Sequence, residues 1–423
     1  MFFTIDALSI IMLIVLAIVC VVVFFHSFTY LRRQKANARI KAIYYLSLLL
    51  FIAALALGYI SGHIVMTWVF TEVTTLAAGV LIYHHRASLA IKSVWKYVFV
   101  CAISVTFIFI GILFWSLALL NAGSTDLSYT SFYNLSDRLN PFWLGLGFVF
   151  IFTGYTAKIG LFPMFTAGID AKDSAPSPSA AMLSSVLVNL GFVGIYRAYA
   201  VIARSSLAAF GQTLIIVTAL ITLFVATVYM VKIANFKRML AYSSIEHSAL
   251  VSLGMVLGPA GCAAAILHLV MHSFIKSGLF LHYPQLAVFY GSKSLDDMGD
   301  YFNRNPFGAV VLVLGLFCIT AVPPSGLFVS ELGIFSAMIQ NGNWLVLILT
   351  MLFLTVLIWA ICKSIFRVVF LPAKNPLAAP QDVKPHPFES VFQLLLFILA
   401  IAIGYFTPIK LISLIAEATF LIY

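Results

Sequence analysis

The feature of this sequence that most limits its fold is a series of long apolar runs separated by short polar loops. A helix needs roughly 20 apolar residues to cross the hydrocarbon core of a bilayer. The runs that meet this requirement lie near residues 5–28, 39–60, 64–84, 97–121, 142–164, 178–203, 209–231, 237–257, 261–290, 307–340, 344–370 and 388–421. Membrane β-barrels show short segments of alternating polarity instead. The sequence therefore predicts an all-α integral membrane protein of about twelve transmembrane helices.

The composition fits a chain whose solvent is the lipid bilayer. Hydrophobic residues fill 63% of the 423 positions and charged residues only 9%, too few to cover a water-soluble protein of this size. The cysteines stand singly within apolar runs and lack the paired spacing of zinc sites and iron–sulfur clusters. They are Cys20, Cys101, Cys262, Cys318 and Cys362. The glycines form no phosphate-binding loop, so we expect no cofactor or metal in this chain.

The basic residues indicate topology rather than nucleic-acid binding. The formal net charge is +10, but Lys and Arg lie in short loops between the apolar runs, not on one patch. With the N-terminus on the outer side, 18 of the 24 basic residues fall in or beside inner loops. An excess of Lys and Arg marks cytoplasmic loops. Arg32, Arg33 and Lys35 follow the first run and no basic residue precedes it, so we expect a retained helix rather than a signal peptide.

Two of the predicted spans are interrupted by proline. The fifth contains Pro163, and the tenth contains Pro323 and Pro324. Proline removes a backbone donor and breaks a helix, and non-helical backbone at membrane depth usually lines a watered cavity. Each interruption also has an ionisable neighbour, Lys158 before the first and Glu331 after the second. The sequence therefore predicts two broken helices beside a polar pathway.

The two interruptions are five spans apart, which indicates an internal repeat. A five-helix unit at 39–203 would be followed by a second unit at 209–370. Because five is odd, the two copies would have opposite orientations, as in inverted-repeat transporters. Flanking helices would occupy 1–38 and 371–423, and no linker divides the chain, so we expect one membrane domain.

Eight ionisable side chains within the predicted spans are candidates for proton transfer, because a charge deep in the bilayer costs several kcal/mol and requires an explanation. They are Glu72, Lys158, Glu246, His247, His268, His272, Lys276 and Glu331. The last two histidines and Lys276 are spaced four apart and share one helical face. Histidine and desolvated lysine can exchange protons near neutral pH, and an ion pair of Glu72 and Lys158 that opens and closes would load and release a proton. The alternative is that these groups only hold helices together as satisfied pairs.

A catalytic metal is not expected among the histidines. The pair His268 and His272 lacks the intervening glutamate of a metalloprotease helix. His84 and His85 lie at an inner helix end beside Arg86 and are expected at the membrane interface. The sequence contains no recognisable redox centre.

Four segments together resemble a known family. They are KIGLFPMFTAGIDAKDSAPSPSAAMLSSVLVNLGFVGIYR, FKRMLAYSSIEHSAL, ILHLVMHSFIKSGLF and TAVPPSGLFVSELGIF, in this order. The chain from DALSI onward is similar to the antiporter-like membrane subunits of respiratory complex I and its relatives. Glutamate followed by histidine after AYSSI looks more like the membrane subunits of energy-converting hydrogenases of the formate hydrogenlyase or hydrogenase-4 type.

The resemblance implies a proton-translocating bundle with half-channels that meet on a central polar axis. By motif, Glu72 matches the glutamate that pairs with the broken-helix lysine, Lys158 matches that lysine, and Glu331 matches the terminal acidic residue. Lys276 and its neighbouring histidines would belong to the axis between them. The resemblance also implies membrane subunits and a peripheral redox module as partners, with nickel–iron and iron–sulfur centres in those subunits. The expected location is the prokaryotic inner membrane.

The sequence departs from the family pattern at three places. Asn189 stands where one branch of complex I subunits has a lysine, and Lys172 stands where the family usually has a histidine. The chain also begins near the family's usual third helix and lacks a long lateral C-terminal helix. A neighbouring subunit would supply the missing helices, or the member is naturally short.

Three other functions remain open at this stage. The fold is shared by Mrp-like cation/proton antiporters and by membrane subunits for inorganic-carbon uptake, and the ion could be Na⁺ instead of H⁺. A shortened subunit could also serve only in assembly. Copurified redox subunits favour the first reading, ion flux from this chain alone favours an antiporter, and pumping that survives loss of the axial charges favours assembly.

Overall fold

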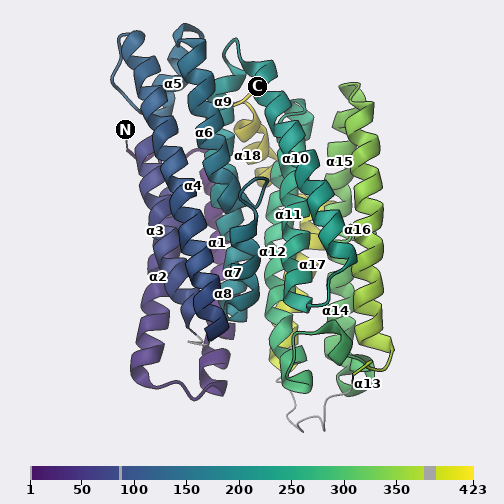
Figure 1. Ribbon diagram of the computed structural model, residues 1–423. Coiled ribbons are helices and arrows are strands. Elements are labelled where there is room, and N and C mark those ends of the chain that lie inside the picture. Colours follow the sequence, from purple (N-terminus) through teal and green to yellow (C-terminus); the bar gives the residue numbers. More distant parts are fainter. Residues whose placement is uncertain (1, 85–87, 376–386) are drawn as a thin grey trace.

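The computed structural model describes residues 2–84, 88–375 and 387–423, and every regular element in them is a helix (Figure 1). The first half contains α1 (Ala7–Arg33), α2 (Ala38–Tyr59), α3 (Ile64–Tyr83), α4 (Ser88–Asn121), α5 (Tyr129–Leu135), α6 (Pro141–Ile159), α7 (Thr166–Ser174), α8 (Ser177–Ser184) and α9 (Val186–Ala203). The second half contains α10 (Ala208–Val231), α11 (Phe236–Met255), α12 (Gly258–Tyr290), α13 (Tyr301–Arg304), α14 (Pro306–Ile319), α15 (Gly326–Gln340), α16 (Trp344–Phe370), α17 (Pro387–Tyr405) and α18 (Ile409–Thr419). The all-α prediction is confirmed.

The predicted spans all correspond to helices or helix pairs. Ten helical segments of the described chain are long and apolar enough to cross a membrane. The more polar α11 and the broken pair α14–α15 account for the two other predicted crossings. The N and C labels lie toward the same end of the bundle, as an even number of crossings requires (Figure 1).

Two helices are interrupted at the prolines, as the sequence predicted. α6 ends at Ile159, and Gly160 follows with a left-handed φ of 93° that glycine adopts without steric cost. Pro163 lies between α6 and α7. Pro323 and Pro324 lie between α14 and α15. Both interruptions therefore place non-helical backbone within the bundle.

Two further interruptions were not predicted. The span predicted at 178–203 is divided at Ser185, between α8 and α9, and the last span is divided before Pro408, between α17 and α18. Serine can satisfy freed backbone groups with its own hydroxyl, and here the Ser185 Oγ donates to the Ala181 carbonyl at 2.7 Å. The sequence carries no strong signal for the break at Ser185, whereas Pro408 is a local signal that the predicted span 388–421 passed over.

The helix α12 forms the centre of the bundle. It packs against α1, α8, α11, α14, α15, α17 and α18. Of its most apolar 18-residue window, 94% is buried, whereas the corresponding window of α16 is only 28% buried. The α16 face that remains exposed is apolar, which suits contact with lipid. Polar side chains on α12 are thus shielded from lipid by neighbouring helices.

A buried arginine joins α9 to the N-terminal end of α1 and the C-terminal end of α2. Arg197 of α9 donates to the carboxylate of Asp6 at 2.9 Å, to Ser9 Oγ at 3.0 Å and to the carbonyls of Tyr59 and Ser61 at 2.7 and 2.5 Å. Its side chain is 2% exposed. The guanidinium nitrogens Nη1 and Nη2 therefore both donate to oxygen acceptors, and these hydrogen bonds join α1, α2 and α9.

Candidate functional site

The first broken helix presents a buried lysine to its neighbours. Lys158 lies in the last turn of α6 and is 3% exposed. Its Nζ donates to Thr75 Oγ1 of α3 at 2.5 Å and lies 5.8 Å from the centre of the Tyr97 ring. One hydroxyl and one aromatic face are weak compensation for an ammonium group removed from water. The protonation of Lys158 should therefore respond strongly to a nearby charge or water molecule.

Glu72 lies one helical turn before Thr75 but does not form an ion pair with Lys158. No pair of charged atoms from these two residues is within 4.0 Å among the ion pairs of the described chain, and Glu72 Oε2 has no hydrogen-bond partner there. The predicted pair is thus separated in this arrangement. Its opening and closing stays a prediction.

A small cavity connects the first broken helix to α7. It has a volume of about 10 Å³, close to the smallest that holds one water. Lys158 and Lys172 both line it, together with Tyr97, Ala157, Gly160, Phe165, Gly168, Ala171, Leu183, Leu187 and Ile245. Lys172, in the short helix between two spans, is 3% exposed, and burial lowers its pKa to about 7. The sequence flagged Lys172 only as a departure from the family pattern.

The axis continues through Lys276 in the middle of α12. This side chain is fully buried, and its Nζ donates to the Leu240 carbonyl of α11 at 2.9 Å. Glu246 of α11 and Lys172 are close enough to act on it electrostatically. Glu246 lies in no ion pair shorter than 4.0 Å within the described chain. Lys276 is therefore held between one negative and one positive neighbour.

Three histidines lie together beyond Lys276. His247 Nδ1 and His268 Nε2 are 3.1 Å apart, and His268 Nδ1 lies 3.0 Å from Ser330 Oγ of α15. The ring centres of His247 and His272 are 5.1 Å apart. Both ring nitrogens of His272 and the Nε2 of His247 are buried without a hydrogen-bond partner in the described part of the chain. Unpaired buried nitrogens of this kind need a water, a proton or a ligand.

Glu331 ends the series on the second broken helix. It lies next to Ser330 in α15, is 7% exposed and makes no ion pair within 4.0 Å among the described residues. The eight predicted residues thus form a series from α3 and α6 to α11, α12 and α15, in which Glu72 is partly buried and the other seven side chains are buried. Thr75, Lys172 and Ser330 join the series although the sequence analysis did not select them.

Asn189 of α9 can both donate to and accept from a hydroxyl, whereas a lysine at this position could only donate. Its Nδ2 lies 3.0 Å from Ser273 Oγ of α12, and its Oδ1 lies 3.2 Å from the same hydroxyl. An amide side chain neither gains nor loses a proton near neutral pH. At this position the chain therefore provides a neutral link to α12, and the titratable groups nearest to Lys276 come from α7 and α11.

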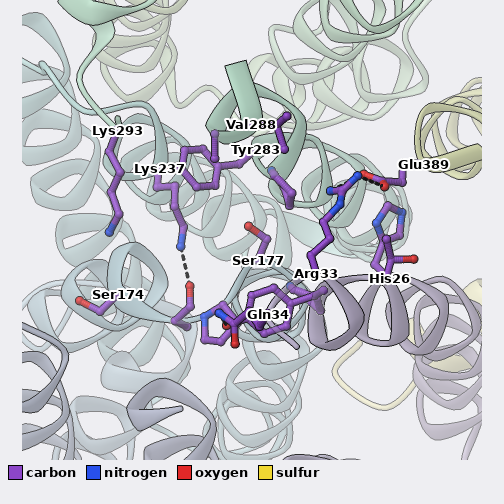
Figure 2. Close-up of a pocket in the computed structure, with 17 residues that line it drawn as sticks. His26, Arg33, Gln34, Ser174, Ser177, Lys237, Tyr283, Val288, Lys293 and Glu389 are labelled. Atoms are coloured by element: carbon purple, nitrogen blue, oxygen red, sulfur yellow. Dashed lines mark hydrogen bonds and ion pairs between the residues drawn. The ribbon is translucent and has the colours of Figure 1, made fainter. Parts of the chain in front are cut away.

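A pocket of about 410 Å³ lies beside the first turn of α11 (Figure 2). Lys237 of α11 lines it, is 2% exposed and donates to the Ala175 carbonyl at 2.5 Å, the bond drawn in the centre of Figure 2. On the other side of the pocket Arg33 meets Glu389 at 2.5 Å. Lys237 starts the helix turn that ends at Leu240, the acceptor of Lys276. Lys237 thus lies within one helical turn of the acceptor of Lys276, although neither Leu240 nor Lys276 lines the pocket.

These features define a class: a polytopic membrane protein with two broken helices and a buried series of titratable groups between them. The chain belongs to the NADH:quinone oxidoreductase/Mrp antiporter transmembrane family, whose model matches residues 61–358. The family resemblance inferred from the motifs is thereby confirmed.

Related sequences carry hydrogenase and quinone-reductase names. The hydrogenase-4 component F homolog of Methylacidiphilum infernorum is 27% identical over 285 residues, which are 66% of this chain and 60% of that protein. Hydrogenase-4 component B of Escherichia coli is 26% identical over 339 residues, 77% of this chain and 49% of that protein. NADH-quinone oxidoreductase subunit N of Desulfitobacterium hafniense is 26% identical over 395 residues, 88% and 77% of the two chains. This chain thus spans only about half to three quarters of these relatives.

Solved structures show the same fold. A chain of the membrane-bound sulfane sulfur reductase, an archaeal respiratory complex, matches with a TM-score of 0.86 and 24% identity over 98% of this chain and 82% of that one. A chain of the Mrp complex from Dietzia sp. matches with a TM-score of 0.82 and 18% identity, covering 100% and 84% of the two chains. All are parts of multi-subunit membrane complexes.

Proposed function

We propose that this chain is a proton-translocating, antiporter-like subunit of a complex I-related membrane oxidoreductase, linked to a hydrogenase module. The observation that supports it most is the buried series from Glu72 to Glu331, in which several charged or basic atoms lack a partner. Structural ion pairs would be satisfied, whereas a relay needs vacant donors and acceptors. The related hydrogenase-4 and subunit N sequences support the redox connection.

In this proposal the work of the chain is electrostatic. When Lys158 leaves Thr75 and approaches Glu72, the opposite charges stabilise its proton. When it returns, the proton is released toward the cavity shared with Lys172, and the change of charge acts in turn on Lys276. The histidines and Glu331 carry the proton to the second broken helix. The partner redox module, with its nickel–iron and iron–sulfur centres, drives these charge changes.

The inner pocket is the proposed entrance from the side of the basic loops. Arg33, Lys237 and Lys293 line it, and the excess of basic loops at this end is typical of the cytoplasmic side. Lys237 would bring protons from the pocket toward the Lys276 region. This assignment puts the N-terminus on the outer face of the prokaryotic plasma membrane.

The two broken helices would belong to inverted repeats at 39–203 and 209–370. Their interruptions lie at corresponding places in the two units, after α6 and after α14. Broken helices that meet across a repeat interface expose their terminal dipoles to the transported ion. The single membrane domain would thus contain two half-channels with opposite polarity.

The deciding experiment replaces Lys158 in the intact complex. Lys158→Met should lower redox-driven proton uptake into proteoliposomes by about 100-fold, because the relay loses its titratable group. The redox reaction and cofactor content of uncoupled complexes should persist. Lys410→Met, which changes an exposed lysine on α18, is the matched control and should keep its proton uptake. Unchanged stoichiometry in Lys158→Met would exclude this function.

An Mrp-like cation/proton antiporter is the second candidate, because the match to the Mrp chain covers the whole of this chain. It predicts Na⁺-dependent proton flux in liposomes without electron donor. The oxidoreductase reading predicts flux only when the redox subunits are present and turning over.

A further inference from the structure

Beyond proton transfer, we propose that His247, His268 and Glu331 form a binding site for a divalent transition metal of the Zn²⁺ type. Ligand atoms of the three residues all lie within 4.8 Å of one another, and all three side chains are buried. The ligands come from α11, α12 and α15, so no local sequence motif could reveal the site.

The nitrogen geometry suits a shared metal. His247 Nδ1 and His268 Nε2 are 3.1 Å apart, and two nitrogens at this separation can both lie about 2.1 Å from one ion. The Glu331 carboxylate has to move inward by roughly 1 Å to complete three ligands, a shift within the reach of a side-chain rotation. A fourth position would remain for water.

The surroundings of His268 resemble those of a metal ligand. Its other nitrogen, Nδ1, lies 3.0 Å from Ser330 Oγ, which also donates to the Leu327 carbonyl. Metal-bound histidines usually have such a second partner, which fixes the ring and its tautomer. Ser330 therefore orients the Nε2 lone pair of His268 toward His247.

The charge balance also favours a cation here. Glu331 is 7% exposed and has no cationic side chain within 4.0 Å among the described residues. A buried carboxylate in this position takes up a proton or a positive ion. Imidazole nitrogens beside a carboxylate prefer Zn²⁺, Co²⁺ or Ni²⁺ over Mg²⁺ and Ca²⁺. A bound metal would occupy the lone pairs that the relay uses and would stop proton transfer.

Direct binding measurements test the site. The purified complex is titrated with Co²⁺, whose visible absorption reports coordination, and then with competing Zn²⁺. One additional ion per chain should bind to the wild type. His247→Gln and His268→Gln should weaken this binding by roughly 100-fold or more, and Ser330→Ala by about 10-fold to 100-fold.

His282→Gln is the matched control. His282 lies on the same helix, is fully buried and is bonded to Gln393 and Tyr301 instead of to the proposed ligands. It should keep wild-type binding. Equal Co²⁺ spectra in His247→Gln, His268→Gln and the wild type, or no bound ion in the wild type, would overturn the proposal.

Transport gives a second readout. Zn²⁺ should inhibit proton uptake by the wild-type complex, and Ser330→Ala should raise the inhibitory concentration by about the same 10-fold to 100-fold. Because binding is measured without turnover, the metal site can stand even if the Lys158 experiment excludes proton translocation. Proton uptake that depends on Lys158, together with no Co²⁺ binding, would reject the metal site and leave the proposed function standing.

Discussion

The bundle buries charge in two regions that differ in how well the charge is satisfied. Around Arg197, near the N-terminal end of α1, four hydrogen bonds from two nitrogens reach a carboxylate, a hydroxyl and two carbonyls. Along the axis, Lys158 donates one hydrogen bond, Glu331 has no ion pair in the described chain, and His272 has no partner there for either nitrogen. Arg197 is 2% exposed and Lys158 is 3% exposed, so the burial of the cation alone does not separate the two regions.

The difference separates a structural charge from a functional one. A buried charge that is fully hydrogen-bonded holds helices together, and removing one partner is costly because the other is left unpaired. A buried charge with vacant positions stabilises the fold little but can change its protonation. The unmet hydrogen bonds of the charged and basic groups therefore distinguish the axis from the Arg197 region, although other buried polar atoms of the described chain also lack a partner.

The largest effect is expected from breaking the satisfied region. Arg197→Met removes the four hydrogen bonds that the guanidinium donates to Asp6 Oδ2, Ser9 Oγ and the Tyr59 and Ser61 carbonyls, and it should lower the free energy of unfolding by about 3–5 kcal/mol. The thermal midpoint of the purified complex and the amount of assembled chain measure the loss.

Lys158→Met provides the contrast in the same assay. Methionine has a similar length and needs no hydrogen bond, so the free energy of unfolding should stay within about 1 kcal/mol of the wild-type value. A loss as large as that of Arg197→Met would show that Lys158 is structural too.

A smaller effect is expected at Lys172. Because burial lowers its pKa to about 7, this side chain is charged below neutral pH and uncharged above it. Lys172→Met should slow proton uptake by about 10-fold to 100-fold, whereas Lys172→His keeps a group that titrates near neutrality and should retain most of the rate. Equal rates in both variants would remove Lys172 from the relay.

A weaker effect should follow from Thr75→Val, which deletes the hydroxyl bonded to Lys158. Hydrogen bonds to charged groups contribute roughly 1.5–3 kcal/mol, so the charged form of Lys158 loses stabilisation and proton uptake should fall several-fold. Thr75→Ser keeps the hydroxyl and should behave like the wild type. The comparison is made in proteoliposomes at a single pH.

The smallest effect concerns the partly exposed ion pairs of Asp296. Asp296 accepts from Arg367 at 2.8 Å and from Lys374 at 3.1 Å. The hydrogen bond from Lys374, followed by that from Arg367, lowers the pKa of Asp296 below 3.8. Its contribution is present above that pH and is lost as the pH falls through the folded-state value.

Asp296→Asn should therefore cost less than about 1 kcal/mol at neutral pH, since solvent screens these partly exposed charges. The difference in thermal midpoint from the wild type should close in acid. A difference that grows as the pH falls would contradict this sign.

The sequence predicted the spans and both proline interruptions because those signals are local. Long apolar runs and proline act on their own segment of chain. The break at Ser185 was not predicted because serine occurs both inside helices and at helix ends, where its hydroxyl can bond to the backbone in either case. Lys172 escaped because IDAKDS is polar, and a polar stretch indicates a loop unless tertiary packing covers it. Thr75 and Ser330 are common membrane-helix residues, and their partners are set by contacts distant in sequence.

The central place of α12 has a consequence for how the protein is made. This helix carries His268, His272 and Lys276, and a lysine at a helix centre alone disfavours entry into lipid by about 2.5–3.5 kcal/mol. Its shelter includes α17, synthesised about a hundred residues later, where the Gln393 amide donates to the Leu281 carbonyl at 2.8 Å. Biogenesis must therefore hold α12 at the insertion machinery until its last neighbours emerge, so ribosome-stalled chains that end before α17 should leave α12 accessible to water-soluble labels.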